Sequence, residues 1–213
     1  MNKGVPIAIG VGIVVVAIGL ASPLFYETEI NEPLPTALDN MEEGLTFEKF
    51  ATMEDDVERQ EIVDRMSSNV KDMIMEKAST MTRDVSEGMD EMMTSSDVSQ
   101  DSPSAPAFSI LKSGEFVGLV GHAAQGTAKI IQVGESENVF LRFENFEVTN
   151  GPDLRVYLTN SEGDVKSGVH LEKLKGSKGD QNYSLANVDF EKYDAVVIYC
   201  QPFGVHFGQA NLV

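Results

Sequence analysis

Apolar residues follow three different patterns along the chain. Residues 5–25 form a continuous run without a charged side chain, residues 45–93 carry apolar positions every three or four residues, and residues 110–213 alternate between apolar and polar. The first pattern is typical of a membrane span, the second of an amphipathic helix and the third of half-buried strands. The chain is therefore predicted to be all-β, with a C-terminal antiparallel β-sandwich of about eight strands. An N-terminal transmembrane helix and a long amphipathic helical stalk precede this domain.

The apolar run has the length that a membrane helix needs. About 20 residues at a rise of 1.5 Å each span a hydrocarbon core of roughly 30 Å. Lys3 precedes the run, and Glu27, Glu29 and Glu32 follow it. This charge asymmetry predicts that residues 1–4 are cytoplasmic and that the residues after the run are extracytoplasmic. A cleaved signal peptide is the alternative to this signal anchor, and it exports the same residues.

The middle of the chain is predicted to be a spacer. Residues 26–44 contain Pro33 and Pro35 and indicate a linker, while the Ser- and Pro-rich residues 94–109 indicate a second one. Between them, residues 45–93 are predicted to form one acidic, methionine-rich helix with an apolar stripe. Such a helix either self-associates as a coiled coil or frays. Its methionines fit a soft hydrophobic seam better than a copper site, because no histidine accompanies them.

Short runs rich in β-branched and aromatic residues follow, separated by Gly and Asn. Val139, Leu141 and Phe143 alternate with polar residues, which predicts a strand with one wet face. Ala195–Cys200 is apolar on both faces and is expected at the centre of a sheet. The predicted strands are 115–120, 127–133, 139–147, 154–159, 169–174, 182–185, 195–200 and 205–212.

Charge and cysteine content exclude several functions. Residues 27–101 hold 21 of the 34 acidic residues and only 6 of the 16 basic ones. This excess of negative charge repels phosphate, so we expect no nucleic-acid partner. Cys200 is the only cysteine, which excludes an intrachain disulfide and a thiolate-only zinc cage.

Four blocks of the C-terminal half resemble a known extracellular family. They are GEFVGLVGHAAQGTAKI, LRFENFEVTNGPDLRVYL, LKGSKGDQNYSL and KYDAVVIYCQPFGVHFGQANLV, and they follow one another in the order expected for the electron-transfer DM-thirteen domain. The resemblance covers residues 113–213 and neither the predicted helix nor the anchor. It implies an all-β cell-surface domain that takes part in electron transfer. It also implies one central cysteine, at the place of Cys200, that acts as a free thiol or holds a prosthetic group.

Cys200 is therefore the candidate redox or ligand residue. Its alternative role is structural, because it shares a face with Val196 and Ile198 and single cysteines are often buried. A low thiol pKa needs cationic neighbours, and no Lys or Arg lies close to Cys200 in the sequence. His122 and His206 are the candidate cofactor ligands beside Cys200. Haem or copper is compatible with such a set, and neither is required, so the metal stays unassigned.

Two functions remain open from the sequence. The first is a membrane-anchored extracytoplasmic accessory domain that works through Cys200 with a redox partner protein, as a redox module rather than a self-sufficient catalyst. The second is a non-catalytic surface interaction or adhesion module, carried on an oligomerising stalk of residues 45–93, with Cys200 buried. Asp153, Asp164 and Asp180 are expected to make turn hydrogen bonds rather than to bind Ca²⁺.

Overall fold

The C-terminal half of the chain is built from strands, as the alternating pattern predicts. The protein is described by a computed structural model that covers residues 33–89, 92, 108–134 and 138–213. Within these residues, eight antiparallel strands form one sheet in the order β5-β4-β7-β8-β1-β2-β3-β6. The strands are β1 (Phe108–Gly118), β2 (Ala124–Val133), β3 (Val139–Val148), β4 (Leu154–Thr159), β5 (Val169–Lys173), β6 (Gln181–Ser184), β7 (Ala195–Cys200) and β8 (Val205–Asn211).

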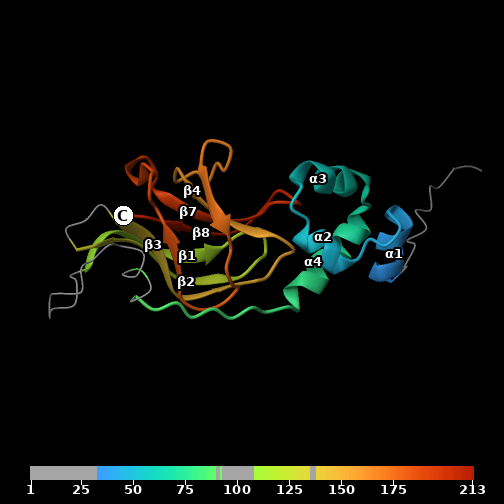
Figure 1. Ribbon diagram of the computed structural model, residues 1–213, viewed down its shortest axis with the longest axis horizontal. Helices are drawn as coiled ribbons and strands as arrows, with labels where there is room; N and C mark the ends of the chain where they lie inside the picture. The colour runs from blue at the N-terminus through green and yellow to red at the C-terminus, as the bar shows by residue number, and fades with distance from the viewer. Residues whose placement is uncertain (1–32, 90–91, 93–107, 135–137) are drawn as a thin grey trace, which may run out of the picture. The chain divides into compact units, whose positions relative to one another are not determined.

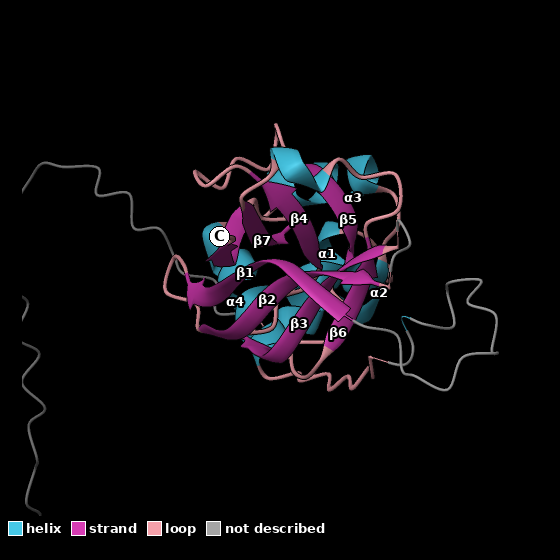
Figure 2. Ribbon diagram, turned by 90° about the vertical axis from the view of Figure 1, so that its left-hand side faces the viewer, coloured by secondary structure: helices cyan, strands magenta, loops and turns pink. Residues whose placement is uncertain are grey.

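Strand β1 joins the two halves of this sheet. Its first residues pair with β2, from Phe108 opposite Val133 onward, whereas its last three residues pair with β8. The sheet therefore curls and faces itself, with β4, β5 and β7 on one side and β1, β2, β3 and β6 on the other (Figure 2). The prediction of eight antiparallel strands is confirmed, and the predicted sandwich is one continuous, nearly closed sheet.

The inward-facing residues of both halves form the main core. Leu141 and Phe143 of β3 are fully buried, as are Val156 and Leu158 of β4, so the alternation in the sequence marks the inner face. Every residue of β7 except Tyr199 is buried, in agreement with the expectation that this strand lies centrally. It pairs with β4 on one side and β8 on the other.

The predicted long helix of residues 45–93 is wrong. In the described chain, three short helices lie within this stretch and a fourth precedes it, and the four gather in one group (Figure 1). Capping residues divide the periodic stretch: the side chains of Thr46, Asp55 and Ser67 accept hydrogen bonds from backbone N–H groups of the following turn. The helices are α1 (Leu34–Met41), α2 (Phe47–Thr52), α3 (Asp56–Arg65) and α4 (Ser68–Ser79).

The helices bury the apolar stripe against one another, whereas the sequence pattern predicts that a partner covers it. Phe50, Ile62 and Ile74 are almost completely buried in a second core formed by the helices. We call α1 to α4, residues 34–79, the helical module. Its start also corrects the predicted linker 26–44, because α1 lies within it; Pro35 stands in the first turn, where the missing N–H costs nothing.

Residues 80–89, which we call the strap, are extended rather than helical. The Val85 N–H donates to Lys178 O at 2.9 Å, and the Glu87 N–H donates to Asp180 O at 3.0 Å. The strap therefore continues from the helical module along the edge of the β-domain, residues 108–213, next to β6.

The membrane prediction concerns residues 5–25, which lie outside the described residues. The same holds for most of the predicted linker 94–109. None of the helices in the described part of the chain is long and apolar enough to span a bilayer.

Candidate functional site around Cys200

Cys200 lies at the end of a central strand, with a strand on each side. Its register partners are Leu154 of β4 and Val205 of β8. The side chain faces inward with Val196 and Ile198, and the residue has no exposed surface. The structure thus places the only cysteine inside the main core, at its end rather than in its middle.

Burial determines the protonation of this thiol. Desolvation raises the pKa of Cys200 to about 12, because a thiolate in a packed core loses its hydration. The backbone N–H groups of Phe203 and Asp153 point to the sulfur and act in the opposite direction, but more weakly. Cys200 is therefore a neutral thiol at physiological pH, and its sulfur is closed to solvent.

A group of four charged side chains, all buried except Asp56, lies beside this end of the core. We call it the ion cluster: Asp153 and Arg155, at the start of β4, and Asp56 and Arg59, from α3. Arg59 Nη2 donates to Asp153 Oδ2 at 2.7 Å and also contacts the Asp56 carboxylate. Arg155 donates to both oxygens of Asp56, at 2.8 and 2.6 Å, and to Asp153 at 2.9 Å.

The ion cluster favours the charged forms of Asp56 and Arg155. The hydrogen bond that Asp56 accepts from Arg155 keeps the pKa of Asp56 below its usual range, and burial opposes this effect. Arg155 is more than nine-tenths buried and its pKa is raised by its hydrogen bonds to Asp56 and Asp153 in spite of desolvation. Two arginines and two aspartates balance, so the cluster satisfies the condition that buried charges be paired.

Arg59 brings a positive charge to the thiol that local sequence does not supply. Its side chain is 1% exposed. Its positive charge slightly lowers the pKa of Cys200, although the negative charge of Asp153 raises this pKa by more. The sequence pattern did not predict a role for Arg59, because only residues close to Cys200 in the sequence were considered as its cationic neighbours. A signal was present, since Arg59 stands at helical spacing with Ile62, Val63 and Met66 and hence on the buried face of α3.

One atom of this arginine is unpaired. Among the described residues, Arg59 Nη1 is a buried side-chain donor without a hydrogen-bond partner. A buried donor left in this state costs about 1–3 kcal/mol. The contact between α3 and the β-domain is therefore less favourable than its ion pairs alone indicate.

The turn that follows Cys200 inserts into the helical module. The Phe203 ring stacks on Phe50 of α2, with 6.1 Å between centroids, and touches the cores of both parts. Gly204, at φ +67, closes the turn through its N–H, which donates to Cys200 O at 3.0 Å. A surface cleft of about 340 Å³ lies between this turn and helices α3 and α4.

The structure does not bring the two candidate histidines together with Cys200. His206 is the register partner of Tyr199 and lies on the opposite face of the sheet from Cys200; its Nε2 is 2.9 Å from Gly163 O. The His122 ring stacks flat on Phe207, with 3.6 Å between centroids, and burial lowers its pKa. No group of three or more His, Cys, Asp or Glu side chains suited to a metal occurs among the described residues.

The donor set therefore does not fit haem or copper in this arrangement. Cys200 faces packed apolar side chains, and His206 belongs to the other face of β8. A metal bound through the thiol needs further ligands on the same side.

Of the three aspartates expected to make turn hydrogen bonds, Asp164 does so, whereas Asp180 and Asp153 bind residues distant in the sequence. Asp164 accepts hydrogen bonds from the Lys166 N–H and the Ser167 hydroxyl, and Asp180 accepts from the Asn145 N–H and from Arg142. Asp153 belongs to the ion cluster instead of a turn network. The three carboxylates are thus engaged in separate places.

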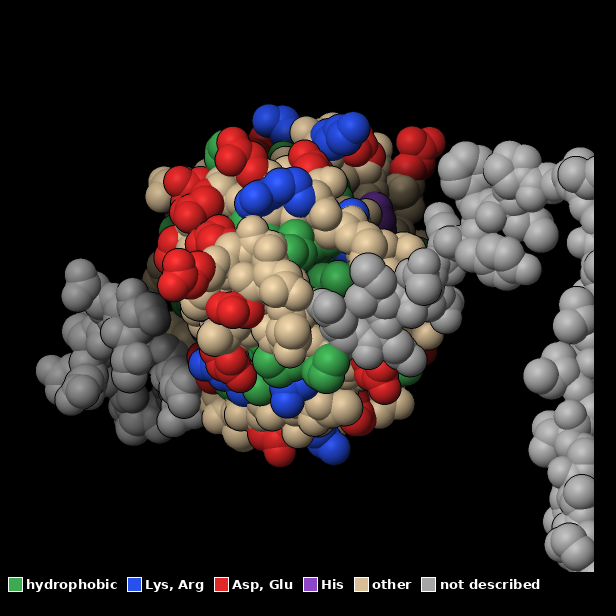
Figure 3. All heavy atoms as spheres, turned by 90° about the vertical axis from the view of Figure 1, so that its right-hand side faces the viewer, with side chains coloured by type: hydrophobic (Ala, Val, Ile, Leu, Met, Phe, Trp, Pro, Cys, Tyr) green, Lys and Arg blue, Asp and Glu red, His purple; other side chains and the backbone are tan. Residues whose placement is uncertain are grey.

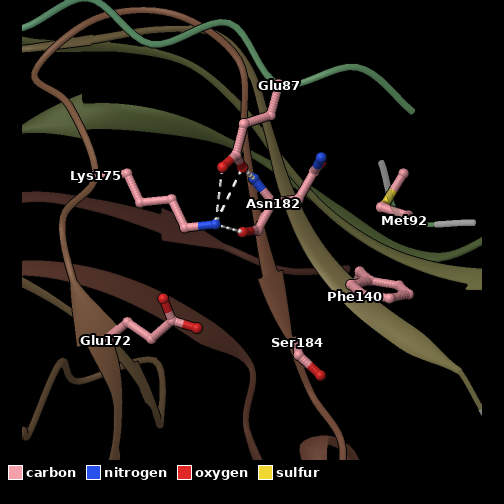
Figure 4. A pocket seen from close by; sticks show the side chains of 7 residues that line it. All are labelled: Glu87, Met92, Phe140, Glu172, Lys175, Asn182 and Ser184. Atoms are coloured by element: carbon pink, nitrogen blue, oxygen red, sulfur yellow. Dashed lines mark hydrogen bonds and ion pairs between the residues drawn. The ribbon is translucent and has the colours of Figure 1, made fainter. Parts of the chain in front are cut away.

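A second cleft, of about 260 Å³, lies beside the strap and away from Cys200. Figure 4 shows Glu87 and Lys175 pointing toward each other across it, with Nζ at 3.0 Å and 3.1 Å from the carboxylate oxygens. Lys175 also donates to Asn182 O at 2.6 Å, and Glu87 accepts from the Asn182 N–H at 2.7 Å. These groups satisfy one another, so the contacts fasten the strap rather than form an open binding site.

Comparisons with known proteins bear on the β-domain alone. No curated protein and no solved structure matches the chain. A family match covers β1 from Glu115 onward and the seven strands that follow, and it confirms the resemblance seen in the sequence. Residues 115–212, which include Cys200, match the family model described as Electron transfer DM13.

Proposed function

We propose that this protein is a membrane-anchored, extracytoplasmic accessory domain that takes part in electron transfer through the thiol of Cys200. The family match over residues 115–212 carries the proposal, because it links this domain to electron transfer and Cys200 is its only cysteine. The apolar residues 5–25 and the single preceding Lys3 support the anchor and its orientation.

The chemistry proposed for Cys200 is thiol–disulfide exchange. The thiol first loses its proton to solvent, and the thiolate then attacks one sulfur of a partner disulfide. A new S–S bond forms as the old one breaks, and the second partner sulfur leaves as a thiolate. Cys200 is thereby oxidised and the leaving sulfur is reduced. With one cysteine in the chain, a thiol from outside must complete the cycle.

The test of this proposal compares wild type with Cys200→Ala. Both proteins are incubated with a disulfide redox buffer, and mixed-disulfide formation is measured by mass spectrometry over a range of potentials. We expect wild type to gain one reversible adduct and the variant none. An absence of any adduct on wild type over days, in folded protein, contradicts the proposal. Visible absorption of protein from its natural host is the companion measurement, since a haem or copper–thiolate band shows that the thiol instead holds a cofactor.

A second function is favoured by the complete burial of Cys200. In that case the protein is an interaction or adhesion module and the cysteine is a packing residue of the core. The two functions predict different results when Cys200 is replaced. The redox function predicts a loss of activity, whereas the interaction function predicts a loss of stability alone. For an interaction module, Cys200→Ala should bind the module's partner as wild type does, and only its free energy of unfolding should be lower.

A further inference from the structure

The helical module covers the end of the β-domain that holds Cys200. We propose that helix α3 is a gate over Cys200, and that the ion cluster is the latch of this gate. This inference rests on the proposed function and adds its regulation: the thiol reacts only when the helical module detaches, while the β-domain stays folded.

The two parts have separate cores, which allows one to move without the other. The buried residues of the helical module pack among themselves, and those of the β-domain form their own cluster. Phe203 touches both clusters, and Met75 of α4 packs against the core of the β-domain. Proteins open in cooperative units of this kind at a lower free energy than that of global unfolding.

The junction between these parts combines a few apolar contacts with several polar ones. The apolar contacts include the Phe203 stack and Met75 of α4, which packs against the core of the β-domain. The polar contacts include the ion cluster, the exposed pair of Lys173 and Glu54 at 3.0 Å and a hydrogen bond from Asn150 to Ala78 O at 3.3 Å. Ion pairs contribute little net free energy after desolvation. Water can solvate all of these groups when the junction opens, including the unpaired Nη1 of Arg59.

Opening changes the environment of Cys200 directly. Arg59 separates from Asp153, which directly precedes Leu154, the residue paired with Cys200 across the two strands. Phe203 separates from the helical core. The face of the helical module that solvent sees carries many acidic side chains around a few apolar ones (Figure 3).

The experiment measures the rate at which iodoacetamide alkylates Cys200, in the full chain, at increasing urea concentrations below the unfolding transition. We expect a labelling rate that is nearly independent of urea at first, because opening the gate exposes much less surface than global unfolding. A rate that rises with the full slope of global unfolding at every urea concentration overturns the proposal, as does immediate labelling without any protection.

Two matched variants test the latch. Asp56→Asn removes the carboxylate that accepts from Arg155 and Arg59, and it should raise the labelling rate roughly 10-fold at low urea. Glu54→Gln makes the same change of charge nearby and breaks a pair at the same junction, but Glu54 is 85% exposed, so its rate should stay within about twofold of wild type. Equal rates in the two variants contradict the latch.

The result separates the gate from the proposed function. Gated labelling together with an absence of reversible mixed disulfide leaves the gate in place and removes the redox role. Mixed-disulfide formation with labelling that follows global unfolding removes the gate and keeps the role. The wild-type urea series stands even if a variant fails to fold.

Discussion

At the scale of single residues, the thiol of Cys200 links the β-domain's stability to alkaline pH. The folded-state pKa of about 12 lies above the ordinary value for a cysteine, so the folded protein keeps a proton that the unfolded chain gives up. The stabilisation is complete below the unfolded pKa and is lost as pH rises toward 12. Burial, rather than any charged partner, is the main cause.

Unfolding by urea at pH 8, 9 and 10 should show this linkage when wild type is compared with Cys200→Ala. We expect the variant to be less stable by about 1–3 kcal/mol at pH 8, because it leaves a cavity. The difference should shrink by up to roughly 1.4 kcal/mol for each pH unit above 9. A difference that stays constant between pH 8 and pH 10 means that the sulfur is exposed to solvent.

Val120 is a strained residue of the hairpin that joins β1 to β2. Its φ is +51°, and the next residue, Gly121, has φ +82°, as in hairpin turns that favour Asn-Gly. A β-branched side chain in this region costs about 1–2 kcal/mol. Val120 is 73% exposed, so its side chain contributes little packing in return.

Val120→Asn should therefore stabilise the protein by about 1 kcal/mol in thermal or urea unfolding. The matched control is Val117→Asn, which replaces another exposed valine, at 58%, in the regular backbone of β1. There the loss of β-propensity predicts a small destabilisation. Stabilisation by both substitutions, or by neither, argues against strain at Val120.

At the scale of elements, the strands were readable from the sequence and the helices only partly. Leu154–Thr159 and Ala195–Cys200 have the predicted bounds, since alternation or a fully apolar run marks a buried strand directly. In the middle segment the apolar spacing was correct but the helix breaks were missed. The breaks depend on side-chain caps at Thr46, Asp55 and Ser67, which a periodicity argument does not see.

The candidate site was only half predictable for a related reason. Cys200 stands out as the single cysteine, and its position on the same face as Val196 and Ile198 indicated burial as one of the two roles left open. The ion cluster joins Arg59 to Asp153, residues 94 positions apart. Such a pairing depends on how the helical module docks on β4, and a single sequence contains no local signal for it.

The strap is held so closely to the β-domain that one glycine is required beneath it. Gly179 has φ +104°, and a Cβ there would overlap the Val85 carbonyl oxygen. Gly179→Ala should thus cost several kcal/mol, or release the strap from residues 178–180. Hydrogen exchange of the Val85 and Glu87 amides, which donate across this contact, distinguishes the two effects.

Gly121→Ala is the control for this substitution. Gly121 also has a positive φ, of +82°, but a Cβ on this residue would meet nothing within 4 Å, so only backbone strain of about 1 kcal/mol is expected. The strap amides should keep their protection in this variant. Equal costs for the two glycines contradict a close strap contact.

At the scale of the whole molecule, the proposal combines an apolar N-terminal segment, a helical module and a β-domain that matches an electron-transfer family. The location of the β-domain decides whether thiol–disulfide exchange is available to it, because disulfides persist outside the cytoplasm and are reduced within it. Orientation in a membrane is therefore the property on which the redox role depends most.

Fractionation of cells that express the full chain tests this orientation. We expect the protein in the membrane fraction after an alkaline carbonate wash, and digestion of its C-terminal domain by protease added outside the cytoplasmic membrane. Replacing Val14 and Val15 by Arg should release it from the membrane or block its insertion, since each charge at the centre of a span costs about 2.5–3.5 kcal/mol. Replacing the same residues by Ile and Leu keeps the apolar run and should change nothing. A chain that stays membrane-bound but protected from external protease places Cys200 on the reducing side, where exchange with a partner disulfide has no lasting substrate.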